Sequence, residues 1–164
     1  MTTEKIDTLE VDKRISRLLS LSNSIEGMME WCISDYIYPK IYTRQRFLID
    51  NILTKLTFER KRQLLKEICD IENVKDRNEM INCIEQIMQT RNKAAHGERF
   101  FDAIAKKIKI QKRGTVSHPK DDVELTDELM DDIEKKTNLV MKCLGELSVE
   151  FRKPNIFPPL ATDF

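Results

Sequence analysis

A seam of apolar residues near the N-terminus constrains the fold more than any other feature of this chain. Over residues 11–36 its members recur with gaps that alternate between four and three, the spacing of one face of an α-helix. Pro39 has no backbone N–H to donate, so we expect this helix to end near Tyr38. The seam consists of Val11, Ile15, Leu18, Ser22, Ile25, Met29, Cys32 and Tyr36, and Leu19, Met28 and Ile33 widen it into a stripe that can face a core.

The composition favours helices throughout the chain. Four glycines stand against 34% charged residues, whereas proteins of strands and tight turns need more glycine for turns with positive φ. At 164 residues with 40% hydrophobic content, the chain suits one domain with a single core. We therefore predict an all-α fold with one helical domain over residues 1–151. Pro154, Pro158 and Pro159 predict an extended tail over residues 152–164.

The same periodicity predicts three further helices. A second helix begins near Thr43, a third is capped by Thr57, and the last is capped by Thr126. The first turn of the last helix is acidic, which the helix dipole favours. Their apolar positions are Phe47, Leu48, Ile52, Leu53 and Leu56 in the second helix, Phe58, Leu64, Leu65, Ile68 and Cys69 in the third, and Leu129, Ile133, Val140, Leu144, Leu147 and Phe151 in the last.

A central helix carries an unusual polar position in its apolar stripe. Asp76, with Glu79 three residues later, has the spacing of a capping box and predicts the start of this helix. Arg91 occupies a position of the stripe where a guanidinium is costly unless it pairs with a carboxylate, faces a cleft or faces another subunit. Glu59 or Glu85 is the expected partner if Arg91 is purely structural. The stripe runs Ile81, Ile84, Met88, Arg91, Ala95.

The end of this central helix carries the residues with the most chemistry. Asn92 and His96 are four apart and share one side of the helix, and Gly97 suits the left-handed residue that closes a helix. Arg91 and His96 are about 140° apart on an ideal helix, so they converge only if the arginine swings toward the helix end. A histidine exchanges protons near neutral pH, and an arginine binds two phosphate oxygens. Together they can support RNA cleavage by 2′-hydroxyl attack without a metal, although His96 can also be a helix-end histidine favoured by the dipole.

A basic segment follows the central helix. Part of it can form a short strand that turns at Arg113-Gly114 and returns through Thr115, Val116 and Val123, and a loop is the alternative. Its cations can bind an RNA backbone, as can Lys93 near the end of the central helix, or they can form a solvated edge. The cations of the segment are Lys106, Lys107, Lys109, Lys112 and Arg113.

Several classes of function are disfavoured. Lys plus Arg equals Asp plus Glu at 28 each, so no global field draws the protein to nucleic acid. Four widely spaced cysteines without a C-x-x-C pair predict free thiols rather than a metal site. No glycine-rich phosphate loop follows a strand, and we expect no cofactor. No apolar run approaches the ~18 residues of a membrane span, and the N-terminus lacks a signal sequence, so we expect a cytoplasmic protein.

The stretch Arg91-Asn92-Lys93-Ala94-Ala95-His96 resembles the R-x4-6-H motif of the HEPN superfamily, whose members commonly place Asn, Asp or His directly after the arginine. The resemblance implies an up-and-down bundle of about five helices, with a homodimer formed through the motif helices and a composite site where two Arg-His sets meet. Many members are metal-independent endoribonucleases, often toxins or antiviral-defence effectors. Carried over by position, His96 is the general acid–base, Arg91 the phosphate ligand and Asn92 a polar support.

Two hypotheses of different classes follow from the resemblance. The first is a homodimeric endoribonuclease that acts on RNA and is held in check by an antitoxin or another regulatory partner. The second is a non-catalytic dimeric regulatory or interaction module, because relatives similar to the mannitol-operon repressor carry a similar RNxxAH stretch and have no established nuclease role. Trp31 and the tyrosines of the first helix are expected to be core or dimer contacts rather than surfaces on which bases stack.

Overall fold

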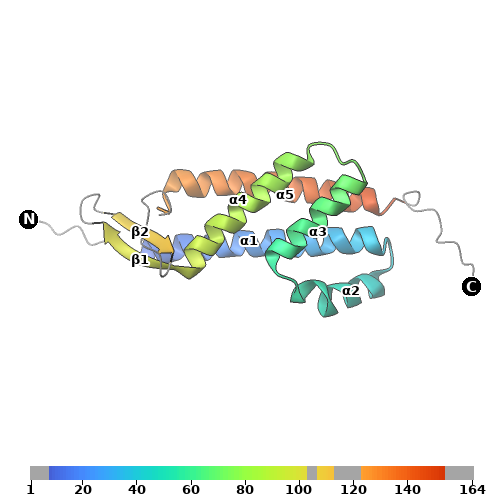
Figure 1. Cartoon of the computed structure of the whole chain (residues 1–164), viewed down its shortest axis with the longest axis horizontal. Helices are drawn as coiled ribbons and strands as arrows, with labels where there is room; N and C mark the ends of the chain where they lie inside the picture. The colour runs from blue at the N-terminus through green and yellow to red at the C-terminus, as the bar shows by residue number, and fades with distance from the viewer. Residues whose placement is uncertain (1–7, 103–106, 113–122, 154–164) are drawn as a thin grey trace, which may run out of the picture.

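Five helices pack together in the computed structural model, and a two-stranded hairpin follows the fourth (Figure 1). The structure describes residues 8–102, 107–112 and 123–153. The predicted all-α class, with a short hairpin after the motif helix, is confirmed. The elements are α1 (Thr8–Ile37), α2 (Tyr42–Asn51), the 3-10 turn η1 (Leu53–Lys55), α3 (Phe58–Ile71), α4 (Arg77–His96), β1 (Gly97–Asp102), β2 (Lys107–Lys112) and α5 (Asp127–Phe151).

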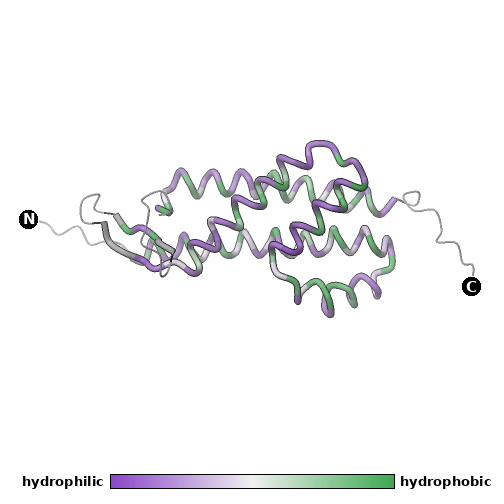
Figure 2. The backbone as a smooth tube through the Cα atoms, in the orientation of Figure 1, coloured by the Kyte–Doolittle hydropathy of each residue, from purple (hydrophilic) through white to green (hydrophobic). Residues whose placement is uncertain are grey.

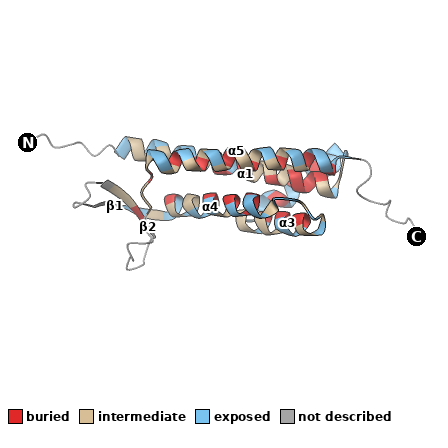
Figure 3. Cartoon of the chain, turned by 90° about the horizontal axis from the view of Figure 1, so that it is seen from above, coloured by how far each residue is buried: buried red, intermediate tan, exposed pale blue. Residues whose placement is uncertain are grey.

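The helices form two layers, with α1 and α5 in one and α3 and α4 in the other (Figure 3). Helices α1 and α5 run side by side in the same direction. Arg14 pairs with Asp127 at their N-terminal ends, 2.9 Å apart, and Asp35 pairs with Arg152 at their C-terminal ends, 2.7 Å apart. Helix α4 runs the opposite way and lies against both. Successive helices thus alternate in direction, and an odd number of them leaves the first and last parallel.

The predicted seam of α1 lies in the core. Six of its eight members are buried and the two at its ends are half-buried. Hydrophobic and hydrophilic residues alternate along the α1 tube (Figure 2). Ser22 is tolerated in the core because its hydroxyl donates to the Leu19 carbonyl, 3.0 Å away. A buried polar group that keeps a hydrogen bond avoids the desolvation penalty of an unpaired one. The buried members are Ile15, Leu18, Ser22, Ile25, Met29 and Cys32.

Two of the three predicted helix caps are confirmed. The Thr57 and Thr126 hydroxyls accept from the backbone N–H groups of Arg60 and Leu129, each at 3.2 Å. The capping box at Asp76 is wrong, because Asp76 has a left-handed backbone (φ 56°) and its side chain makes no capping bond. An N-cap side chain reaches the first turn from an extended backbone, which the tight loop before α4 does not provide.

The segment after α4 forms a hairpin whose first strand the sequence did not predict. Strands β1 and β2 pair antiparallel from Gly97↔Lys112 to Asp102↔Lys107. The predicted turn at Arg113-Gly114 lies outside the described residues. Val123 does return to the sheet, through two hydrogen bonds with Ile110 of 2.9 and 3.0 Å. Ile110 is buried, and β2 contacts α4. Thr115 and Val116 lie outside the described residues, as does the predicted tail from Pro154.

Burial protects the cysteine thiols. All four cysteines are free, and burial raises the pKa of each, to about 11 for Cys69. We therefore expect Cys32 and Cys69, which are fully buried, to resist a maleimide reagent at pH 8 while the protein is folded. Mass spectrometry after a timed reaction, with and without urea, measures this. Cys69 labelling that is equally fast in both conditions would contradict the buried position.

Candidate functional site

The buried face of α4 includes the arginine position. Arg91 continues the line from Ile87 to Ala94 with gaps of four and three, and it is half-buried. The predicted stripe was wrong by one residue at two positions. Ile87 is buried where Met88 was expected, and Ala94 is buried where Ala95 was expected, whereas Met88 is half-buried and Ala95 is exposed. Helix α4 packs against α1, α5 and α3 at once, so its buried arc is wider than a single seam. The buried residues of α4 are Met80, Ile81, Cys83, Ile84, Ile87 and Ala94.

Arg91 has no carboxylate partner among the described residues. Its Nη1 donates to the Asn92 Oδ1 at 3.0 Å, and its buried Nε has no hydrogen-bond acceptor within the described part of the chain. Both expected structural partners are taken by Arg62, whose guanidinium lies 2.8 Å from Glu59 and 3.3 Å from Glu85. The Arg62 hydrogen bond accordingly lowers the pKa of Glu59. The prediction that Glu59 or Glu85 neutralises Arg91 is therefore wrong.

His96 is exposed and stands apart from Arg91 within one chain. The two positions are separated by about 140° around the helix and about 7.5 Å along it. The bond to Asn92 draws the guanidinium toward the side that Asn92 shares with His96. The structure thus joins Arg91 to Asn92 and leaves His96 one turn beyond. No hydrogen bond holds the His96 imidazole within the described residues.

The side of α4 that carries Asn92 and His96 is open and nearly uncharged. Its one acidic residue is Glu85, which pairs with Arg62 and accepts a hydrogen bond of 3.1 Å from the Gln89 side-chain amide. Asn92, Ala95 and His96 are exposed within the described chain. The centres of subunit interfaces are depleted in charged residues in the same way. We call Glu85, Met88, Gln89, Asn92, Ala95 and His96 the open face of α4.

The backbone after His96 is extended. Gly97 has φ −77° and ψ 152°, so the predicted left-handed closure is wrong, and its N–H donates to the Lys93 carbonyl. The helix passes directly into β1, because Gly97 is the first residue of the sheet and pairs with Lys112. An ion pair between Arg99 and Asp12 ties β1 to α1. His96 consequently sits at a fixed junction of helix and sheet rather than at a frayed helix end.

The predicted basic patch is only partly placed. Lys93 is half-buried, and Lys109 is half-buried in β2 and engaged with other groups. Lys107 and Lys112 lie in β2, and the pairing of Lys112 with Gly97 brings the backbone of that strand beside the motif. Lys106 and Arg113 lie outside the described residues. An RNA-binding role for these lysines stays a prediction.

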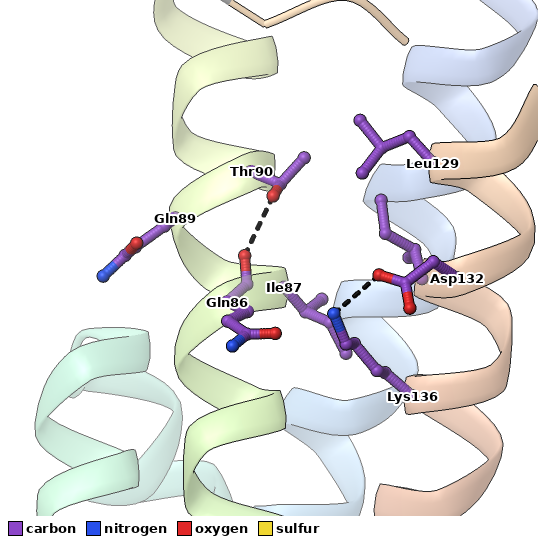
Figure 4. Close-up of a pocket in the computed structure, with 8 residues that line it drawn as sticks. Gln86, Ile87, Gln89, Thr90, Leu129, Asp132 and Lys136 are labelled. Carbon is purple, nitrogen blue, oxygen red and sulfur yellow. Dashed lines mark hydrogen bonds and ion pairs between the residues drawn. The ribbon is translucent and has the colours of Figure 1, made fainter. Parts of the chain in front are cut away.

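A groove between α4 and α5 lies close to the motif but does not include it (Figure 4). Its volume is about 220 Å³, its floor is formed by Ile87 and Ile133, and Lys136 pairs with Asp132 across 2.6 Å. Because this ion pair cancels the charge of the groove, it does not suit a phosphate group. The lining residues are Gln86, Ile87, Gln89, Thr90, Leu129, Asp132, Ile133 and Lys136.

The described residues contain no group of three or more His, Cys, Asp or Glu side chains placed to hold a metal ion. Within the same ranges, every helix is too short or too polar to cross a membrane. Comparisons with protein-family models, curated proteins and solved structures find no match for this chain. The candidate site therefore depends on the geometry of α4 and on the motif itself.

Proposed function

We propose that this protein is a homodimeric, metal-independent endoribonuclease of the HEPN type, acting as a toxin or antiviral-defence effector. The observation that carries the proposal is Arg91, a half-buried cation without a carboxylate partner in the described structure. A cation in this setting is suited to an anion supplied from outside the chain, such as a phosphodiester. The open face of α4 beside it supports pairing with a second copy.

The proposed chemistry assigns one role to each motif residue. Arg91 binds the phosphate oxygens and favours the extra negative charge of the transition state, and Asn92 holds the guanidinium in place. One histidine accepts the proton of the 2′-hydroxyl as its oxygen attacks phosphorus. A second histidine protonates the 5′-oxygen as the P–O5′ bond breaks, which yields a 2′,3′-cyclic phosphate and a 5′-hydroxyl. Two copies of His96, one from each subunit, supply both proton transfers.

This chemistry has a direct test. Purified protein is incubated with single-stranded RNA in excess EDTA, and the product ends are identified by mass spectrometry. We expect cleavage that survives chelation and leaves 2′,3′-cyclic phosphate ends. An absence of cleavage, or cleavage that requires added Mg²⁺ and leaves 5′-phosphate ends, would contradict the proposal.

A second candidate, a non-catalytic dimeric regulatory module, is favoured by the bond between Arg91 and Asn92. A guanidinium already engaged by a neighbouring side chain, with its Nε buried, can serve to shape an interface. In that case we expect Arg91→Ala to raise the dimer dissociation constant about 30-fold, measured by sedimentation velocity, because truncating one partner of a buried charged hydrogen bond at an interface costs about 2 kcal/mol. Arg60→Ala, which removes an exposed arginine of α3, is the control. The same dimerisation in both variants, together with RNA cleavage by the wild type, would exclude this candidate.

A further inference from the structure

A second surface, at the far end of α1 from the motif, combines aromatic rings with cations. It is formed by the last turns of α1 and by α2, a short helix that packs on α1 (Figure 1). Tyr42 and Phe47 are each 63% exposed, which is unusual for large aromatic side chains. We call Trp31, Lys40, Tyr42, Arg44 and Arg46 the α2 platform.

The rings of the α2 platform are already stacked. The Trp31 and Tyr42 centroids lie 6.1 Å apart and their planes differ by 18°. Trp31 is half-buried, whereas most of the Tyr42 side chain is open to solvent. A planar ring from outside can extend this stack without any rearrangement of the protein. Trp31 packs against the core, which fits the predicted core or dimer contact, and it also stacks on Tyr42.

The segment that carries Tyr42 is rich in cations, and the guanidinium of Arg44 lies over the Tyr38 ring, 5.9 Å from its centroid. Over residues 37–55 the chain carries Lys40, Arg44, Arg46 and Lys55, all exposed, against a single carboxylate, that of Asp50. Arg46 lies one turn after Tyr42 on the same side of α2, and its Nε donates to Asp50 at 2.8 Å. The Asp50 carboxylate offsets part of the charge of Arg46, but its bond uses only Nε, so the two Nη groups of Arg46 remain for another acceptor. This concentration of positive charge contrasts with a chain whose formal net charge is +0.

We propose that the α2 platform binds single-stranded RNA, with a base stacked on Tyr42 and a backbone phosphate on Arg46. Aromatic rings bind bases of any sequence through their faces, and neighbouring cations follow the phosphates. A folded protein partner would need an acidic surface to match the charge of the platform, whereas RNA supplies phosphates and planar rings together. The proposal rests on the proposed function for the identity of the ligand, and it makes α2 a holding site for the substrate strand.

The test measures binding without cleavage. Full-length protein carrying His96→Ala is titrated with a fluorescein-labelled oligouridine or oligoadenosine, and anisotropy gives the dissociation constant. The fluorescence of Trp31, the single tryptophan of the chain, reports whether the ligand reaches the stack. We expect Tyr42→Ala to weaken binding roughly 5- to 100-fold and Tyr42→Phe to restore it, because the ring and not the hydroxyl stacks. Arg46→Ala should reduce the slope of log K against log[salt] by about 0.7, and Tyr42→Ala should leave that slope unchanged.

Arg60→Ala is the matched control, because it removes an exposed arginine from α3 without touching the platform. Equal affinity in the Tyr42→Ala, Arg46→Ala and Arg60→Ala proteins would overturn the proposal, as would an absence of oligonucleotide binding at millimolar concentration. If RNA binds at the platform but the wild type never cleaves it, the proposed function fails while this inference stands. If the wild type cleaves RNA and the platform variants bind it normally, only this inference fails.

Discussion

Replacement of His96 by alanine is expected to lower RNA cleavage in EDTA by roughly 10²- to 10⁴-fold, the usual contribution of a general acid–base. His96 is exposed and holds no hydrogen bond within the described structure, so its truncation should change the free energy of unfolding by no more than about 0.5 kcal/mol. A loss of activity without a loss of stability separates a chemical role from a structural one. Initial rates on a labelled single-stranded RNA measure the effect.

The second histidine of the chain provides the control for this variant. His118 lies outside the described residues and beyond the motif, and we expect His118→Ala to cleave RNA at the wild-type rate. Circular dichroism and thermal unfolding verify that both variants keep the fold. Equal cleavage by the wild type and by His96→Ala would contradict a catalytic role for His96.

Replacement of Lys61 by methionine is expected to destabilise the protein by about 3 kcal/mol, the low end for breaking a buried ion pair. Lys61 lies on α3, is only 2% exposed, and donates to Glu26 and Glu30, the latter at 2.6 Å. Methionine fills much of the same space but leaves two carboxylates of α1 without their cation. The glutamate side chains retain 24% and 12% exposure, so water offsets part of the loss. Urea unfolding followed by circular dichroism gives the change in free energy.

Two further variants isolate the electrostatic part of that loss. Lys66→Ala removes an exposed partner of Asp70 on the same helix and should cost about 0.5 kcal/mol or less. The triple variant Lys61→Met/Glu26→Gln/Glu30→Gln should be more stable than Lys61→Met alone, because no unpaired charge remains. If the triple variant is no more stable than Lys61→Met, the loss of stability comes from packing and not from the unpaired charges.

The pH dependence of this contribution has a definite sign. Burial by itself lowers the pKa of Lys61, but its hydrogen bonds to Glu26 and Glu30 outweigh burial and raise that pKa. The stabilisation is therefore fully present below the ordinary lysine value of about 10.4 and is lost only as the pH rises through the raised folded value. We expect the difference in unfolding free energy between the wild type and Lys61→Met to be constant from pH 7 to pH 9.

The sequence predicted the helices well because their stripes are long and periodic. The α1 seam and the caps at Thr57 and Thr126 depend on local spacing and local hydrogen bonds, which a single sequence carries. The capping box predicted at Asp76 and Glu79 was wrong because the tight loop gives Asp76 a left-handed backbone, from which its side chain does not cap the helix. The pairing of β1 with β2 was not predicted, because short strands are placed by tertiary contacts more than by local spacing.

The candidate site was only partly predictable. The position of Arg91 in the apolar stripe of α4 followed from periodicity. The pairing of Glu59 and Glu85 with Arg62 instead of Arg91 depends on how α3 packs on α4. Lys61 was missed, although its place between Phe58 and Leu65 on the apolar side of α3 was a usable signal. The proposed composite site would need a second chain, and contacts between subunits are not encoded in the local spacing that a single sequence provides.

The most direct measurement of the central claim is cleavage by dimers that contain one wild-type and one His96→Ala subunit. Equal amounts of the two proteins are mixed in EDTA, allowed to exchange subunits until mass spectrometry shows mixed dimers, and compared with the same total amount of wild type. If the composite site needs His96 from both subunits, the mixture should show roughly a quarter of the wild-type activity, because only a quarter of the dimers then carry two histidines. Roughly half of the wild-type activity would contradict a site shared between subunits, because each wild-type subunit would then act alone.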